Sequence, residues 1–505
     1  MNIKQAKEYI KNAVNLYLKK DEFGEYRVPV VRQRPIFLLG APGIGKTAIM
    51  EQIAQEMGIA LVSYSMTHHT RQSALGLPFI TKKNYGGQKF SVSEYTMSEI
   101  IASVYDAMEE SGIKEGILFL DEINCVSETL APSMLQFLQY KVFGRHRVPE
   151  GWVIVTAGNP PEYNKSVREF DVVTMDRLKV LEVEPEYRIW KEYAMDRQIH
   201  NAIINYLDLK KDHFYCMEMT TKGRSYVTAR GWEDLSEILY LYEDESLTVD
   251  EALIGQYLRN EKVVKEFCAY YDLYRKYKKD YHIEEILSGN ASVQAISRAK
   301  EAPFDERLSL LGMLLDKALA DMKDCMERLT YLSDLKVSLK AIGNSAGKTY
   351  PDQIMERMEK QAEGRKKLLQ NLQAASALSD LDKKKHRRVI GFLDECRKEL
   401  YVSGCASGEE AFTFLKERYG ERLGRAKKES IRIQQELHAL FGFVQEAFGE
   451  GNEMLILVTE LTVNSFGAQF LAAFGSPDYQ RYNEALMLSE RKEDIKTQIA
   501  ELSLV

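Results

Sequence analysis

The chain has 505 residues, 45% of them hydrophobic and 28% charged, and carries a formal net charge of −7. At about 150 residues per domain, this length predicts about three globular domains with a large apolar core. The acidic balance argues against a general nucleic-acid or membrane-surface binder, because such domains are usually basic. The six cysteines form no CxxC pair, which disfavours a disulfide framework and favours a reducing, cytoplasmic setting. No apolar run approaches the roughly 18 residues that span a bilayer.

The first part of the chain alternates short apolar runs with helical patterns, which predicts a parallel sheet covered by helices. After Pro185 the strand-like runs thin out and helical periodicity takes over. We therefore expect an α/β domain over 1–183, a small helical domain over 184–245 and an all-α extension over 246–505. The five predicted strands are Ile36–Leu39, Leu61–Tyr64, Ile117–Leu120, Val153–Thr156 and Val180–Val183.

A glycine-rich stretch lies between the first strand and a helical pattern. It fits the pattern GxxxxGK[ST] in full, as Gly40-Ala41-Pro42-Gly43-Ile44-Gly45-Lys46-Thr47, and Ala48 continues into the helix. Glycines permit backbone angles that aim successive N–H groups at phosphate oxygens, and the helix N-terminus favours the same anion. Lys46 is expected to reach the β- and γ-phosphates, and the Thr47 hydroxyl to ligate Mg²⁺. The stretch therefore predicts a binding site for ATP and Mg²⁺.

An acidic pair, Asp121-Glu122, follows the apolar strand Ile117–Leu120. A strand that is buried on both faces delivers such carboxylates to the edge of the sheet where α/β folds bind ligands. Asp121 is expected to hold the Mg²⁺ shell. Glu122 is expected to act as the base that polarises the attacking water. Together with the glycine-rich stretch, the pair predicts ATP hydrolysis.

With these motifs and three later ones, the chain resembles the AAA+ ATPases over roughly residues 30–245. Val153-Ile-Val-Thr-Ala-Gly-Asn159-Pro is similar to the strand that ends in the sensor 1 residue, so the resemblance implies that Asn159 aligns the lytic water. Met175-Asp-Arg177-Leu lies where this family carries its arginine finger. Arg177 is the preferred candidate, Arg168 competes for the role, and a salt bridge at a strand start is the alternative. Ser225-Tyr-Val-Thr-Ala-Arg230-Gly-Trp resembles the start of the lid helix, which implies a sensor 2 role for Arg230.

Within AAA+, the chain resembles the MoxR group, which is related to the magnesium-chelatase motor subunits. Arg71-Gln-Ser-Ala-Leu-Gly76-Leu-Pro78 is similar to the point where that clade inserts a segment into helix 2. Lys83 to Lys89 is expected to be the turn of a β-hairpin in the insert. A second hairpin is expected from Lys141 to Trp152. Two departures stand out: no Phe follows Arg177, and the long extension has no counterpart in the group.

The resemblance implies a Mg²⁺-dependent ATPase that forms a homo-oligomeric, hexameric ring and remodels or activates a partner protein. By the same resemblance, the partner is expected to carry a von Willebrand factor A domain. Nucleic acid is not an expected ligand. Three alternatives stay open: a chelatase-type motor, a nucleic-acid-associated motor, and a nucleotide-gated scaffold with slow turnover. A chain that ends near residue 245 holds every motif of the site, so it is expected to bind ATP without the extension.

The extension carries three patterns that each have two interpretations. Apolar residues at a and d spacing from Leu308 to Leu332 predict a coiled-coil hairpin within 305–400, or one helix of an ordinary bundle. Tyrosines spaced at 270, 274, 277 and 281 indicate either a buried helical stripe, which we prefer, or a stacking platform for single strands. The basic run 383–388 indicates a solvated face or a contact for an acidic partner, rather than a targeting signal.

Overall fold

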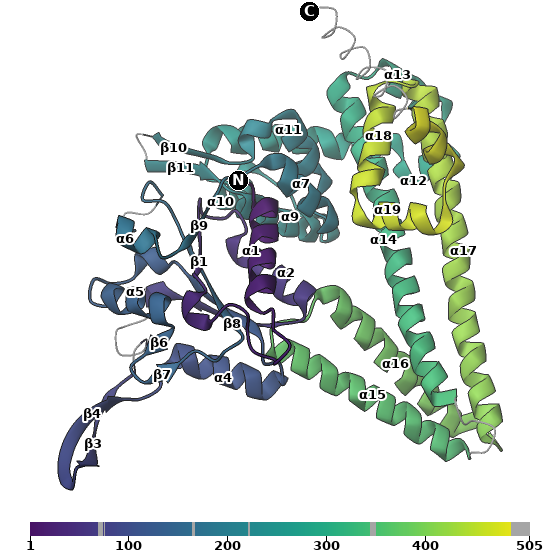
Figure 1. Cartoon of the computed structure of the whole chain (residues 1–505). Coiled ribbons are helices and arrows are strands. Elements are labelled where there is room, and N and C mark those ends of the chain that lie inside the picture. The colour runs from purple at the N-terminus through teal and green to yellow at the C-terminus, as the bar shows by residue number, and fades with distance from the viewer. Residues whose placement is uncertain are drawn as a thin grey trace, which may run out of the picture. The chain divides into compact units, whose positions relative to one another are not determined.

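The computed structural model describes residues 1–68, 74, 76–163, 167–220, 223–343, 350–403 and 405–485. The chain divides into two compact units (Figure 1). The first comprises Met1–Ile189 and Glu363–Arg387, and the second comprises Trp190–Ala362 and Arg388–Val505. This division differs from the three predicted domains, because the lid residues pack with the extension and a short piece of the extension packs with the α/β domain. Residues Arg71–Ser73 and Leu75 of the predicted insert lie outside the described residues.

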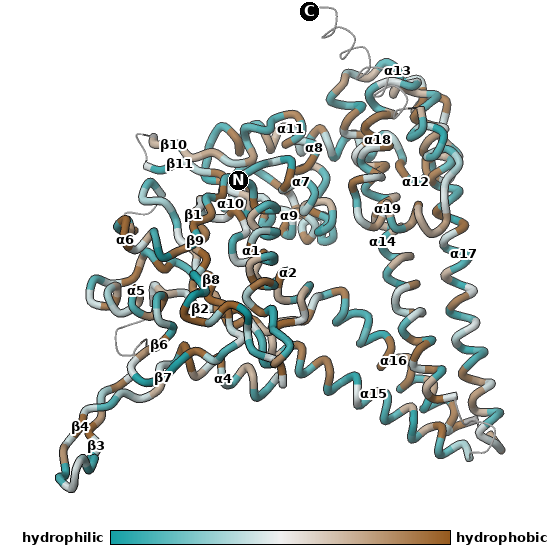
Figure 2. The backbone as a smooth tube through the Cα atoms, viewed as in Figure 1, coloured by the Kyte–Doolittle hydropathy of each residue, from teal (hydrophilic) through white to brown (hydrophobic). Residues whose placement is uncertain are grey.

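A five-stranded parallel sheet forms the centre of the first unit, in the order β2-β5-β8-β1-β9. All five predicted strands are confirmed. The middle strands are buried, and the brown colour of strands in Figure 2 shows their apolar character. Both properties are typical of a sheet covered on both faces. The strands are β1 (Ile36–Gly40), β2 (Ala60–Ser65), β5 (Gly116–Asp121), β8 (Trp152–Gly158) and β9 (Lys179–Val183).

Helices cover this sheet and connect its strands. Four of them are α1 (Ile3–Tyr17), α2 (Lys46–Met57), α4 (Glu99–Ser111) and α5 (Ala131–Tyr140). The N-terminal helix begins with a capping box, in which the Asn2 side chain accepts from the Gln5 N–H at 2.9 Å. Because every strand is parallel, the carboxyl ends of β1, β5 and β8 meet at one edge, and these ends carry the motifs that predict the site.

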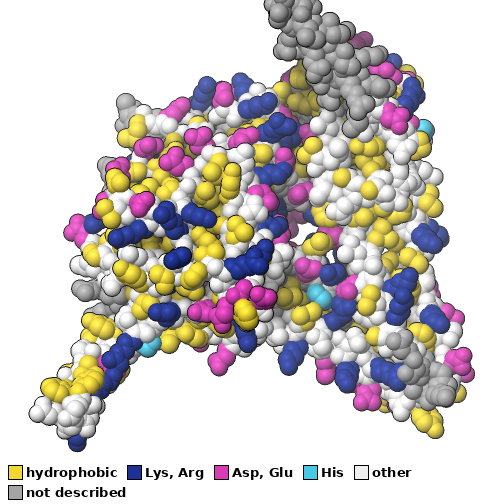
Figure 3. All heavy atoms as spheres, in the orientation of Figure 1, with side chains coloured by type: hydrophobic (Ala, Val, Ile, Leu, Met, Phe, Trp, Pro, Cys, Tyr) yellow, Lys and Arg dark blue, Asp and Glu magenta, His cyan; other side chains and the backbone are white. Residues whose placement is uncertain are grey.

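Two β-hairpins interrupt the α/β pattern at the predicted places. The first pairs β3 (Pro78–Tyr85) with β4 (Gln88–Tyr95) through a turn at Gly86 and Gly87, whose φ angles are 59° and 87°. Positive φ at both turn residues is what a two-residue hairpin turn requires. The second pairs β6 (Val142–Phe143) with β7 (His146–Arg147). Apolar side chains gather on the first hairpin (Figure 3), and they include the exposed Phe79, Ile80, Tyr85 and Phe90.

The tip of a helical hairpin from the extension completes the core of the first unit. The end of α15 (Pro351–Ala374) and the start of α16 (Asp380–Ser403) meet at this tip. Ala375 and Ala377 are buried in the same apolar cluster as residues of β2, β5 and β8. The Leu61 N–H of β2 donates to the Ala375 carbonyl at 3.0 Å. Because β2 is an edge strand, the tip satisfies a backbone donor that the sheet leaves unpaired.

We expect the Ala375→Glu substitution to destabilise the first unit strongly. Ala375 is fully buried, so the new carboxylate would lose its hydration without a partner, at a cost of about 3 kcal/mol or more in the free energy of unfolding. Gln373→Glu adds the same charge two residues earlier, at an exposed position near the end of α15, and is expected to cost less than about 0.5 kcal/mol. Chemical denaturation followed by circular dichroism measures both variants. If the Ala375→Glu and Gln373→Glu variants were equally stable, this result would contradict the burial of Ala375 in the core of the first unit.

The second unit begins with the lid residues. These form α7 (Tyr187–Asp196), α8 (Asn201–Leu209) and α9 (Ala229–Asp244). Between α8 and α9 lies a two-stranded antiparallel ribbon, β10 (Cys216–Thr220) and β11 (Gly223–Val227), where a purely helical domain was expected. Helix α9 begins as predicted near Arg230, and the Thr228 hydroxyl caps it by accepting from the Gly231 N–H at 3.2 Å.

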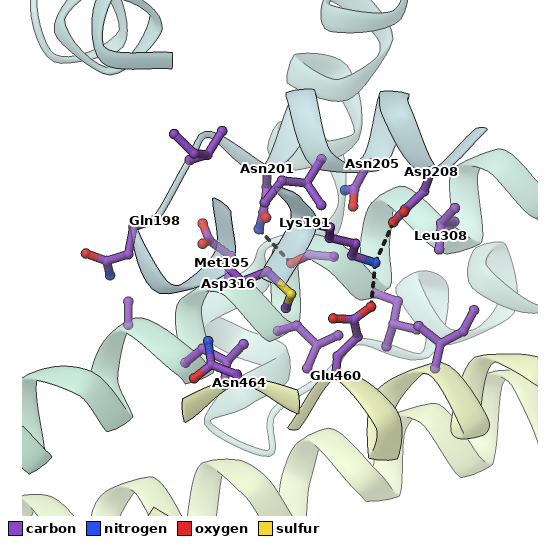
Figure 4. A pocket seen from close by; sticks show the side chains of 18 of the residues that line it. Lys191, Met195, Gln198, Asn201, Asn205, Asp208, Leu308, Asp316, Glu460 and Asn464 are labelled. Atoms are coloured by element: carbon purple, nitrogen blue, oxygen red, sulfur yellow. Dashed lines mark hydrogen bonds and ion pairs between the residues drawn. The ribbon is translucent and has the colours of Figure 1, made fainter. Parts of the chain in front are cut away.

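Charged and polar contacts fasten the lid helices to the extension (Figure 4). The ammonium of Lys191 on α7 lies 2.9 Å from Asp208 on α8 and 2.5 Å from Glu460 on α18 (Asn452–Val463). These groups line a cavity of about 50 Å³, which has room for only one or two water molecules. Burial raises the pKa of Asp316 in the same wall to about 6. The lid and the extension therefore form one packed body.

Two long helices make the arm of the second unit. Helix α14 (Phe304–Gly343) pairs with α17 (Gly408–Phe448), and the pairs Asp321–Arg432 and Arg328–Glu429 show that the two run antiparallel. The predicted seam from Leu308 to Leu332 lies on α14, but its partner starts beyond the predicted range 305–400. Further helices of the extension are α10 (Glu251–Tyr257), α11 (Glu261–Tyr281), α12 (Ile283–Leu287), α13 (Val293–Glu301) and α19 (Ser465–Phe474).

The tyrosine stripe of α11 is buried, which agrees with the preferred interpretation of this pattern as a buried helical stripe. Tyr274, Tyr277 and Tyr281 are at most 8% exposed, so these rings pack inside the unit and are not available as a stacking platform. Among the described helices, none alone has the length and apolar character of a membrane span, whereas α18 and α19, bent by 89° at their junction, meet the criterion as a pair.

Candidate active site

The glycine-rich stretch forms a loop between β1 and α2. Gly43 and Gly45 have φ angles of 73° and 91°, a region that L side chains rarely adopt. Gly40 has a different reason to be glycine, because an added Cβ would lie 2.6 Å from the Val183 carbonyl oxygen of β9. Gly45 is also the N-cap of α2, so the loop and the first turn of the helix together present backbone N–H groups in the manner of an anion site.

Lys46 and Thr47 connect this loop to the neighbouring strands. Lys46 is 8% exposed, and its ammonium donates to the carbonyls of Gly40 and Ala41 at 2.7 and 2.9 Å. It also donates to Oδ1 of Asn159, which follows β8, at 2.8 Å. The Thr47 hydroxyl donates to Asp121 Oδ2 at 3.0 Å. The structure thus brings together four of the predicted site residues, which the sequence places on three separate strand ends.

Glu122 lies beside this cluster, and its backbone is held in an unusual conformation. Its φ of 54° and ψ of 37° are left-handed values, which cost free energy in a residue other than glycine. Its N–H donates to Asp121 Oδ1 at 2.8 Å, and the hydroxyl of Ser65 at the end of β2 donates to its Oε2 at 3.1 Å. The carboxylate of Glu122 is therefore oriented by a group from the neighbouring strand.

Sequence reasoning missed two residues that position this cluster, Ser65 and Asn124. Asn124 is 4% exposed, and its Nδ2 donates to the Asn159 carbonyl at 2.8 Å. An added Cβ on Gly158 would lie 2.4 Å from the Asn124 oxygen, so only glycine leaves room for this contact. Each of the two residues follows a predicted strand, and a polar residue at such a place is a weak signal because loops usually begin with polar residues.

The three predicted arginines lie in different surroundings. Arg168 pairs with Glu128 at 2.5 Å. Arg177 follows the short helix α6 (Val172–Met175) and is exposed, and its guanidinium has no ion pair within 4 Å among the described residues. Asp171 caps α6 by accepting from the Thr174 N–H. Hydrogen bonding to the side chain and then the backbone of Thr174, together with the nearby Arg177 charge, lowers the pKa of Asp171. Arg230 is exposed on the first turn of α9, in the second unit.

The residues present fit a nucleotide with Mg²⁺. Hydroxyl and carboxylate oxygens, as on Thr47 and Asp121, are the ligands that Mg²⁺ prefers, usually completed by phosphate oxygens and water. One buried acceptor, the Asn124 oxygen, has no hydrogen-bond partner in the described part of the chain. The described residues contain no group of three or more His, Cys, Asp or Glu side chains that could hold a metal alone. The oxygen atoms of Thr47 and Asp121 therefore suit a Mg²⁺ ion whose other ligands include the oxygens of a bound phosphate.

A parallel sheet, a glycine-rich phosphate loop and acidic residues at the end of a neighbouring strand define a P-loop nucleotide-binding domain. Residues 36–174 match the model of the "ATPase family associated with various cellular activities (AAA)", so the α/β unit contains an AAA domain. This agrees with the resemblance to AAA+ ATPases. The matched range ends before Arg177 and Arg230.

Other comparisons add little to this assignment. No curated protein matches the chain. Among solved structures, the chain is similar to NtrX from Brucella abortus, with 16% identity and a TM-score of 0.24, over 41% of each chain. The aligned region thus spans less than half of that protein, and a likeness this weak says nothing about function.

Proposed function

We propose that the protein is a Mg²⁺-dependent ATPase of the MoxR-like type, which uses ATP hydrolysis in an oligomeric ring to remodel or activate a partner protein. The observation that carries the catalytic part is the convergence of Lys46, Thr47, Asp121 and Asn159, with Glu122 beside them. The AAA domain at 36–174 supports an ATPase in general. The two β-hairpins at the places expected of the MoxR group support the finer assignment.

Each residue of the cluster has a role in this proposal. Lys46 and the loop N–H groups bind the phosphates, and Thr47 and Asp121 hold Mg²⁺, which neutralises charge on the phosphate oxygens. Glu122 accepts the proton of the attacking water, and Asn159 orients that water. Arg177 stabilises the charge that builds up on the transferring phosphoryl group of a neighbouring subunit, since it is exposed and Arg168 is engaged with Glu128. Arg230 on the lid helix α9 keeps the sensor 2 role that the resemblance implies.

We infer the kind of partner from the resemblance to the MoxR group and from the exposed surface of the hairpin β3–β4. The hairpin β3–β4 presents Phe79, Tyr85 and Phe90 to solvent, and its register places these three on one face. An isolated two-stranded hairpin of this kind gains stability when its apolar face packs on another surface. A client protein or an associated protein with a von Willebrand factor A domain is our proposed occupant. Nucleic acid is disfavoured by the net charge of −7 and by the buried tyrosine stripe.

Phosphate release from ATP by the full chain tests this proposal. With excess Mg²⁺ we expect turnover in the range of about 1–10³ per second that is typical of enzymes, and a loss of at least tenfold when the metal is chelated. Nucleotide binding measured in parallel separates an ATPase from a scaffold. Tight ATP binding with no turnover beyond the background would favour the nucleotide-gated scaffold, and activity unchanged by chelation would contradict the role of Thr47 and Asp121.

A further inference from the structure

A cavity of about 630 Å³ opens in the arm of the second unit, between α14, α16 and α17. This volume falls within the range of about 300–1,000 Å³ that is usual for small-molecule sites. None of its residues belongs to the nucleotide cluster. Its polar wall holds four arginines and one glutamate, namely Arg328, Arg388, Arg422, Arg425 and Glu395.

Two of the arginines are held in place by carboxylates. Arg328 pairs with Glu429 at 2.9 Å. Arg422 contacts Glu395 at 2.5 Å and donates to the Tyr331 hydroxyl at 3.1 Å. These contacts fix the direction of both guanidinium groups, so this part of the wall is preorganised, while Glu429 and Glu395 balance its charge.

The charges of the other two arginines, Arg388 and Arg425, are less completely balanced by carboxylates. Arg388 approaches Glu327 only to 3.7 Å, which is longer than a hydrogen bond. Arg425 is exposed and has no hydrogen bond or ion pair through its side chain among the described residues. The cavity wall therefore has an excess of positive charge, because Arg388 has only this long ion pair with Glu327 and Arg425 has no anionic partner among the described residues.

The floor of the cavity is apolar and aromatic. Phe392 is 1% and Tyr331 is 5% exposed, and the Arg422 guanidinium lies 4.8 Å from the centre of the Phe392 ring. A Cβ on Gly391 would contact nothing within 4 Å, so this glycine keeps one wall open and is not required by packing. An apolar floor beneath a charged rim suits a ligand that has both an apolar and an anionic part.

We propose that this cavity binds a phosphorylated small molecule, whose phosphates pair with Arg388 and Arg425 and whose apolar part lies against Tyr331 and Leu332. Guanidinium groups match the oxygens of phosphate in paired hydrogen bonds, which an ammonium group cannot do. The concave form and the aromatic floor favour a small molecule over an acidic protein segment, which would need an extended surface. This site goes beyond the proposed ATPase function, because it lies entirely in the extension.

Calorimetric titration of the full chain with inorganic tripolyphosphate tests the proposal. Lys46→Ala is the background for every variant, so that the phosphate loop contributes as little as possible to the heat. We expect saturable binding of one equivalent in this background. The double substitution Arg388→Ala with Arg425→Ala should weaken it at least tenfold, because it removes both guanidinium groups that are proposed to bind the phosphates. The matched control, Lys427→Ala with Lys428→Ala, removes two exposed charges of α17 outside the cavity and should change affinity less than about twofold.

Three results would overturn the proposal. The first is the absence of saturable binding up to about 10 mM tripolyphosphate. The second is an equal loss of affinity in the arginine and lysine pairs, or no loss in either, since binding would then not involve the cavity. The third is tighter binding of a glutamate decapeptide through the same two arginines, which would make the occupant an acidic protein segment. Thermal unfolding of each variant shows that folding is unchanged, as expected for exposed arginines.

Discussion

Replacing Glu122 by Gln is expected to lower the turnover of ATP by about 10²–10⁴ while ATP still binds. The amide keeps the size of the carboxylate and can hold a water molecule, but it cannot accept the proton of that water. The phosphate-binding groups, Lys46 and the loop, are untouched. Single-turnover kinetics with radiolabelled ATP measures the chemical step, and filter binding measures affinity.

The controls for this prediction separate binding from chemistry. Lys46→Ala is expected to abolish nucleotide binding, because it removes the charge that meets the β- and γ-phosphates. Glu110→Gln removes a carboxylate from an exposed position of α4 and is expected to leave both quantities unchanged. An unchanged kcat in Glu122→Gln, at equal ATP affinity, would rule out Glu122 as the base.

The Arg177→Ala substitution is expected to lower turnover by about 10³ or more if the side chain acts as an arginine finger. A group that a neighbouring subunit supplies can act only in an assembly, so the activity per subunit of the unaltered protein should rise with concentration. Arg168→Ala should have a much smaller effect, because Arg168 is paired with Glu128. Steady-state rates over a range of protein concentrations, together with light scattering, provide the measurement.

A mixing experiment tests directly whether one subunit supplies Arg177 to the site of its neighbour. Arg177→Ala subunits keep Glu122, and Glu122→Gln subunits keep Arg177, so one kind of interface in a mixed ring has both groups intact. Mixtures should therefore recover part of the hydrolysis that each variant lacks alone. If mixed rings form but no ratio restores activity, Arg177 acts within its own subunit or the finger is another residue.

The expectation that a chain ending near residue 245 binds ATP needs revision. Such a chain holds every motif of the site, but it lacks Leu372, Ala375 and Ala377 of the helical hairpin tip, which pack in the core beside β2. It also ends within the second unit, where Lys191 pairs with Glu460. Cutting there would uncover apolar surface on both units, so the structure argues for loss of stability before any effect on nucleotide binding.

The sequence by itself determined the parallel sheet, its five strands and the residues of the phosphate loop. These features are local: apolar runs mark buried strands, and consecutive glycines and Lys46 form one loop. Because parallel strands end at the same edge, the sequence predicts that Asp121 and Thr47 lie at one edge of the sheet, whereas their hydrogen bond depends on the strand order, in which β8 lies between β1 and β5.

Only the tertiary structure decided which distant segments meet. The edge of β2 is completed by Ala375, α14 pairs with α17 rather than with the next helix, and the arginines of three helices surround one cavity. Apolar periodicity shows that a helix has a buried face but not which partner covers it, because many helices offer similar faces. The same holds for Asn124 and Ser65, since a polar residue after a strand acquires its role only when a particular neighbour, Asn159 or Glu122, lies within hydrogen-bond distance.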